Sequence, residues 1–124
     1  MIHEEICTCE VCKLAKEKGF DVPTHYAYNE NCRKAMYMEL CLNRNTKDSR
    51  SISAPTQSLL QRWLREEKKW NIVVRMYENE GYYWFIQNSK GKLQESYFTY
   101  ADEMFATYEL ALEDALAYSL KNLV

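Results

Sequence analysis

From residue 55 onward the chain alternates between helical and strand periodicity, and this alternation most constrains the fold. A first apolar stripe recurs at the spacing of an amphipathic helix and consists of Leu59, Leu60, Trp63 and Leu64. Strand-like runs follow at residues 71–77, 82–88 and 93–100, joined by short turns that contain glycine. A last helix is predicted to begin after the cap Thr107 and to run to Leu123. This part is therefore predicted to form a helix, three strands and a helix.

The first 54 residues predict a shorter set of elements. A helix is expected at 9–18, capped by Thr8 and ended by Gly19. Strands are expected at 24–28 and 35–42. In the second of them, apolar residues alternate in the manner of a half-buried strand; they are Met36, Met38, Leu40 and Leu42. Residues 43–53 are polar and lack periodicity, which predicts a flexible loop, and Ser53 with Pro55 is predicted to begin the next helix.

Together these patterns predict an α+β protein with helices packed on an antiparallel sheet, in the order α-β-β-α-β-β-β-α. A chain of 124 residues is the size of one ordinary domain and can bury roughly two-thirds of its unfolded surface. We expect a single domain, 1–124. Its parts are an N-terminal helix and turn (1–22), a hairpin and loop (23–54) and the α-β-β-β-α part (55–124).

The charge balance argues against a protein that grips a phosphate backbone non-specifically. Lys plus Arg number 16 against 18 Asp plus Glu, for a net charge of −2. No apolar run approaches the roughly 20 residues that span a bilayer, and the N-terminus lacks a basic region followed by an apolar one. We therefore expect a cytoplasmic protein that inserts in no membrane and keeps its five cysteines reduced.

The N-terminal cysteines raise the question of a metal. His3, Cys7, Cys9 and Cys12 offer zinc-ligand chemistry within ten residues, but Cys9 and Cys12 lie in a helical segment and lack the paired turns of a zinc knuckle. We predict that the cysteines act as small apolar residues, with no metal and no cofactor, and keep this set as the alternative.

No pattern of residues predicts catalysis. His3 and His25 stand in no motif with a cysteine, and the adjacent carboxylates of the chain fit solvated faces. We predict a protein that is not an enzyme.

The aromatic content points instead to binding. Three Trp, ten Tyr and four Phe exceed what one small core readily holds, which favours an interaction protein, a homodimer with a further protein partner still unknown. The interface or pocket candidates are Trp63, Trp70, Tyr83, Trp84 and Phe85. Alternation places Trp84 on one face of its strand and Tyr83 and Phe85 on the other, so one set is expected in the core and the other exposed.

A nucleic-acid-associated accessory protein is the alternative, because bases stack on strand aromatics. Its predicted phosphate contacts are Arg33, Lys34, Arg44, Lys47 and Arg50. The order helix, three strands, helix also resembles a double-stranded-RNA-binding domain. The start of the last helix is acidic here, however, with Glu109 and Glu113 where those domains carry lysines.

Several local motifs resemble a family of small uncharacterised phage, prophage and conjugative-element proteins of Bacteroides-type bacteria. They are Ser53-Ala-Pro-Thr, Trp63-Leu-Arg-Glu, Asn71-Ile-x-Val, Gly81-Tyr-Tyr-Trp, Tyr108-Glu-x-Ala-Leu-Glu-x-Ala-Leu and the opening Cys12-Lys-Leu-Ala-Lys-Glu-Lys-Gly-Phe-Asp. The resemblance implies an origin in a mobile element and no particular mechanism.

Overall fold

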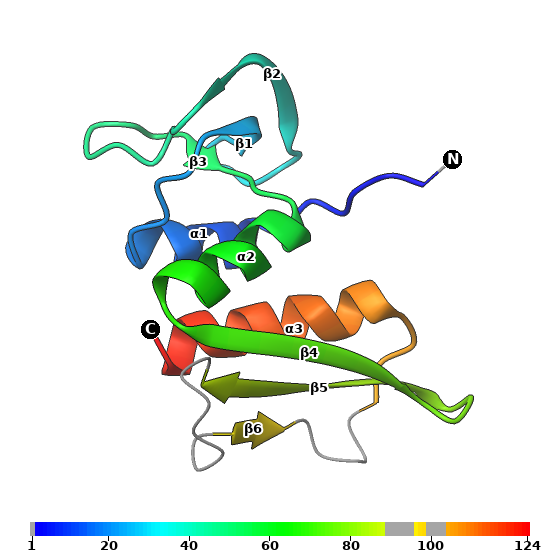
Figure 1. The fold of residues 1–124 in the computed structure, drawn as a ribbon. Coiled ribbons are helices and arrows are strands. Elements are labelled where there is room, and N and C mark those ends of the chain that lie inside the picture. Colours follow the sequence, from blue (N-terminus) through cyan, green and yellow to red (C-terminus); the bar gives the residue numbers. More distant parts are fainter. Residues whose placement is uncertain (1, 89–95, 99–103) are drawn as a thin grey trace. The chain divides into compact units, whose positions relative to one another are not determined.

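The structure is a computed structural model that describes residues 2–88, 96–98 and 104–124. Its elements follow the order α1 (Cys9–Glu17), β1 (Thr24–Tyr28), β2 (Met36–Leu42), β3 (Ile52–Ser53), α2 (Gln57–Glu67), β4 (Trp70–Tyr77), β5 (Gly81–Asn88), β6 (Ser96–Phe98) and α3 (Tyr108–Asn122) (Figure 1). The strands form two antiparallel sheets, ordered β2-β1-β3 and β4-β5-β6. The predicted α+β class is confirmed, with the strands in two sheets instead of one.

The chain divides into two compact units, Met1–Leu59 and Leu60–Val124, which we call the first and the second unit. The boundary lies inside α2, a few residues beyond the start of the α-β-β-β-α part at residue 55. In the first unit α1 packs beside β3, and in the second unit α3 packs on β4 and β5. Each unit thus has its own sheet and its own helix.

Helix α1 begins and ends as the sequence predicts. The Thr8 hydroxyl accepts a hydrogen bond from the Val11 N–H at 3.4 Å, and Gly19 adopts a left-handed φ of 90°. The chain then turns back, because the Phe20 N–H donates to the Ala15 carbonyl at 2.9 Å. The Phe20 ring and Ala15 are both buried, so this turn closes the core of the first unit beneath α1.

The predicted flexible loop 43–53 is wrong in its last residues, which form β3 and pair with β1. Side chains hold the rest of the segment. The Asn45 amide donates to the Phe20 carbonyl and accepts from the Ser53 N–H, both at 2.9 Å, and the Lys16 ammonium donates to the Ser49 and Ser51 carbonyls at 2.9 Å. A two-residue strand has no periodicity, so the sequence pattern carries no sign of it.

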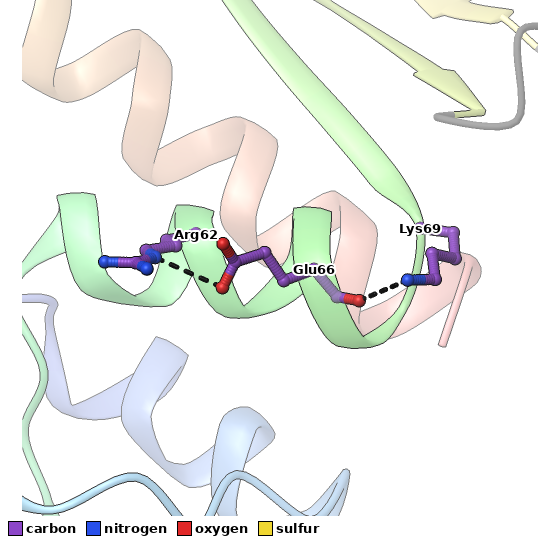
Figure 2. Close-up of polar contacts among 3 residues, drawn as sticks. All are labelled: Arg62, Glu66 and Lys69. Carbon is purple, nitrogen blue, oxygen red and sulfur yellow. Dashed lines mark hydrogen bonds and ion pairs between the residues drawn. The ribbon is translucent and has the colours of Figure 1, made fainter.

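Helix α2 begins after Thr56, whose hydroxyl accepts from the Leu59 N–H at 3.2 Å, so the cap predicted at Ser53 is wrong. On its exposed face Arg62 forms an ion pair with Glu66 at 3.1 Å, one turn away (Figure 2). Lys69 adopts a φ of 65°, and its ammonium donates to the Glu66 carbonyl at 2.6 Å. These exposed contacts end the helix and lead directly into β4.

In the second unit β4 and β5 pair in unbroken register, from Trp70 opposite Asn88 to Tyr77 opposite Gly81. Gly81 adopts a φ of 139°, and a Cβ at this position would lie 2.7 Å from the Phe105 carbonyl oxygen. Thr107 caps α3 as predicted, its hydroxyl accepting from the Leu110 N–H at 3.1 Å. The predicted strand 93–100 lies partly outside the described residues, and its centre forms β6.

Candidate functional site

Strand β2 is the largest exposed apolar element of the first unit. It lies at the edge of its sheet, and six of its seven residues are exposed. The exposed fractions of its large side chains are 56% for Met36, 62% for Tyr37, 67% for Leu40 and 48% for Leu42. The predicted strand is confirmed, but its predicted half-burial is wrong, because neither face of this edge strand is covered within the described residues.

A bulge shapes β2. The pairs Tyr26–Tyr37 and Thr24–Leu42 are separated by two residues on β1 but by five on β2, so the middle of β2 departs from the ladder. The backbone there is still satisfied on the inner side, because the His25 ring Nδ1–H donates to the Met38 carbonyl at 3.1 Å. The His25 side chain therefore helps to hold the bulge in place.

The Arg44 guanidinium completes this support. It donates to the Thr24 carbonyl at 3.0 Å and to the Leu40 carbonyl at 2.9 Å, with a longer contact of 3.4 Å to the Leu42 carbonyl. Arg44 was predicted as a phosphate contact. In the structure its N–H groups donate to the backbone of β1 and β2 instead. The sequence alone does not reveal this role, because an arginine in a polar segment looks the same whether its side chain is solvated or bonded to the backbone.

An aromatic cluster flanks the strand on the β1 side. The Tyr37 ring stacks on the His25 ring, with centroids 5.6 Å apart and planes inclined by 15°, and it meets the Tyr26 ring edge-on at 5.5 Å. Tyr37 and His25 are both exposed. The cluster orders the Tyr37 side chain on β2 before any partner binds, which lowers the entropy that binding must overcome.

The other predicted basic contacts lie around the same sheet. Arg33 and Lys34 are exposed and directly precede β2, and Lys47 and Arg50 are exposed in the segment that leads to β3. The nucleic-acid alternative combines these basic residues with aromatic residues on strands, and those aromatic residues belong to the second unit. The structure therefore does not place these basic residues and those aromatic residues within one unit.

The predicted interface residues of the second unit are mostly core. Trp84 is only 3% exposed; its indole N–H donates to the Asp114 carboxylate at 2.9 Å, and its ring lies 5.2 Å from that of Tyr118 on α3. Trp63 is also buried, with the Lys68 ammonium 5.2 Å from its ring centroid. One of the two aromatic sets of this strand was expected in the core, and Trp84 belongs to the set that packs against a helix.

The opposite face of β5 differs from the expectation. Phe85 was expected to be exposed if Trp84 was core, but it is only 9% exposed, and the Arg75 guanidinium lies 5.1 Å from its ring centroid. Tyr83 is half-buried and meets the Tyr77 ring edge-on at 6.5 Å. Trp70 is half-buried at the start of β4. These five aromatic residues therefore do not form one exposed patch.

The cysteines are arranged differently from either prediction. Cys9 at the start of α1 forms a disulfide with Cys32 in the turn before β2, so the prediction of five reduced cysteines is wrong. The sequence could not show this pair, since 23 positions separate its members. Cys7 and Cys12 are buried, and the Cys12 thiol donates to the Cys7 carbonyl at 3.6 Å.

The alternative zinc set is not assembled either. Among residues 2–88, 96–98 and 104–124, no three side chains of His, Cys, Asp or Glu lie where they could hold a metal together. His3 is exposed, and the Cys9 sulfur is taken up by its bond to Cys32.

Comparisons with protein-family models, with curated proteins and with solved structures find no match to this chain. Among the helices that the structure describes, none has both the length and the apolar character needed to cross a bilayer.

Sequence reasoning missed β2 as the exposed apolar surface. The available signal was the presence of large apolar side chains on both faces of one short strand, with Leu40 on one and Tyr37 on the other. A strand buried on one face carries polar residues on the other, so this composition fits a strand whose partner is not part of the same sheet.

Proposed function

We propose that this chain is a non-enzymatic interaction protein and that it binds another protein through β2. The observation that carries the proposal is the exposure of Met36, Tyr37, Leu40 and Leu42 on one edge strand. The exposed parts of these side chains amount to on the order of 500 Å², within the range of the largest apolar patch on a typical monomer, and such patches are often functional.

The edge position supports the same proposal. An edge strand presents unpaired backbone donors and acceptors, and proteins usually protect such strands with inward charges, proline or a covering loop. Here the central residues of β2 are Met38, Glu39 and Leu40, so one carboxylate interrupts an otherwise apolar strand. Strand addition is a common mode of recognition because backbone hydrogen bonds supply affinity while alternate side chains supply selectivity.

An origin in a mobile element, which the sequence resemblance implies, stays a prediction. The nucleic-acid alternative also stays a prediction, with Arg44 removed from its contacts because that side chain serves the bulge of β2.

Cys41 provides a direct test, because it lies between Leu40 and Leu42 and is the exposed cysteine of the chain, while Cys7 and Cys12 are buried. A membrane-permeable maleimide should therefore label β2. We expect labelling in the cells that produce the protein to be at least several-fold slower than labelling of the purified protein at nanomolar concentration.

The substitution Leu40→Asp should remove that protection, because it places a carboxylate in the centre of the apolar surface. Leu110→Asp is the matched control, since Leu110 is 54% exposed on α3 and lies in the other unit. Equal labelling rates in cells and in dilute solution would show that nothing covers β2 and would refute the proposed function.

A further inference from the structure

We infer that the partner of β2 is β2 of a second copy of this chain, paired antiparallel about a two-fold axis so that two three-stranded sheets become one of six strands. The inference rests on the proposed function, since it names the partner of the same surface. It follows from the direction of the backbone groups along β2, the position of its charges and the area that the pairing buries.

The backbone groups of β2 alternate in a definable way. The Tyr26 carbonyl accepts from the Ala54 N–H at 2.9 Å, so the main chain of Tyr26 faces β3, and Tyr37 opposite it turns its own groups away from β1. The Met38 and Leu40 carbonyls point inward, to His25 and Arg44. Because a peptide group is trans, the N–H groups of Glu39 and Cys41, which follow those carbonyls, point toward the free edge, as does the main chain of Tyr37.

This alternation limits how two copies can pair. In an antiparallel pair, residues directly opposite each other point their side chains to the same face of the sheet. A two-fold axis perpendicular to the sheet must therefore lie midway between the two copies of one residue, and that residue defines the register. An axis at Glu39 sets two carboxylates against each other, and an axis at Tyr37 or Met38 sets Glu39 against an uncharged residue. An axis at Met36 sets Glu39 of each copy against Arg33 of the other.

The Met36 register is therefore the one that the charges favour. Arg33, three residues before β2, and Glu39, at its centre, are both exposed, and opposite charges brought close across an interface attract while like charges repel. The pair occurs twice in the dimer because the axis repeats it. Exposed ion pairs contribute little to affinity, so the charges select the register and the apolar side chains supply most of the binding.

The area is compatible with a specific but dissociable dimer. Edge pairing covers only the sides of these side chains that face the other copy and leaves both faces of the sheet open, so the two copies together bury less than about 1,000 Å², the size of a weak interface. Most of the affinity must then come from a few side chains at the axis, where Met36 meets its own copy and Tyr37 meets Ala35. We expect a dimer at micromolar concentration that dissociates on dilution.

Exchange of the two charges tests the inference. Native mass spectrometry of the full chain should show a dimer for the unaltered protein. It should show mainly monomer for Glu39→Arg, where Arg33 meets an arginine, and for Arg33→Glu, where two carboxylates meet. An equimolar mixture of the two variants should restore the dimer as a heterodimer, because each ion pair then reforms with its charges correctly placed.

The controls separate folding from association. Leu40→Asp should be monomeric and Leu110→Asp dimeric, and all four variants should keep the circular dichroism of the unaltered protein because their side chains are exposed. In a Cys41→Ser background, Met36→Cys should form a disulfide-linked dimer across the axis, and Leu110→Cys should not.

Each result decides between the two proposals. If the protein is monomeric up to high micromolar concentration while Cys41 stays protected in cells, the inference that the partner is a second copy is overturned. The proposed function then stands with another protein as the partner. A dimer that the mixture of charge variants does not restore, or that Met36→Cys does not cross-link, overturns this strand pairing. Restoration together with cross-linking supports it.

Discussion

Reduction of the Cys9–Cys32 disulfide should destabilise the first unit by about 3 kcal/mol. The bond closes a loop with a sequence separation of 23, and the loss of loop-closure entropy in the unfolded chain gives this magnitude. A unit of this size has a total free energy of unfolding of about 3–9 kcal/mol, so the bond is a large part of its stability. The melting temperature of the first unit should fall by roughly 10–20 °C.

The structural consequence should be local. Cys32 adopts a left-handed φ of 56° in the turn that precedes β2, and the bond fastens this turn to the first turn of α1. Without it, the turn depends on weaker contacts such as the hydrogen bond from the Cys32 N–H to the Asn29 carbonyl at 3.1 Å. Reduction should therefore loosen the β1–β2 hairpin before it affects the second unit.

The assay combines thiol counting with unfolding. The denatured, unreduced protein should react with a thiol reagent at three of its five cysteines, and at all five after reduction. Thermal unfolding followed by circular dichroism should shift on reduction, and hydrogen exchange read by mass spectrometry should assign the loss of protection to residues 1–59.

Two variants complete the experiment. Cys9→Ser should reproduce the shift and become insensitive to reductant, and Cys41→Ser should behave as the unaltered protein does. Five reactive thiols in the unreduced protein would refute the disulfide. An unchanged melting curve after confirmed reduction would refute the assigned contribution.

Three further substitutions test packing and backbone. Trp84→Ala should cost about 3–5 kcal/mol in urea unfolding, because it empties a buried ring site and removes an indole hydrogen bond; a loss below 1 kcal/mol would mean that this tryptophan is not core. Arg44→Ala should cost about 2 kcal/mol by removing a charged donor from the β1 and β2 carbonyls, whereas the exposed neighbour Lys47→Ala should change stability by less than about 0.5 kcal/mol. Similar losses for these two would contradict the structural role. Gly81→Ala should cost more than Gly19→Ala, about 2–4 against about 1 kcal/mol, because both have positive φ but only the first would bring a Cβ against a carbonyl oxygen; the reverse order in thermal denaturation would contradict this.

Local elements were predictable because their signals act over a few residues. The cap at Thr8, the stop at Gly19 and the cap at Thr107 each involve a hydrogen bond or a backbone conformation within four residues, and all three are confirmed. The paired strands β4 and β5 were also predictable, since a short turn joins them and their apolar residues alternate.

The candidate site was only half predictable. Alternation correctly identified β2 as a strand, but it could not show that β2 is an edge strand with both faces exposed, because burial depends on which elements pack against it. The same limit explains Phe85. Its position on the face opposite Trp84 follows from period two, whereas its burial depends on the elements that pack around β5, from one of which Arg75 approaches its ring.

The sequence by itself therefore determined the helices, most of the strands and the α+β class, because caps, glycines and hydrophobic periods are short-range properties of the chain. Only the tertiary structure decided that residues 52–53 pair with β1, that Cys9 meets Cys32, that Arg44 supports a bulge and that β2 stays uncovered. The first three features join segments that are distant in sequence, and the last is a strand that no other described element covers. Such features depend on the free energy of the whole packed unit, which cannot be inferred from any single stretch of residues.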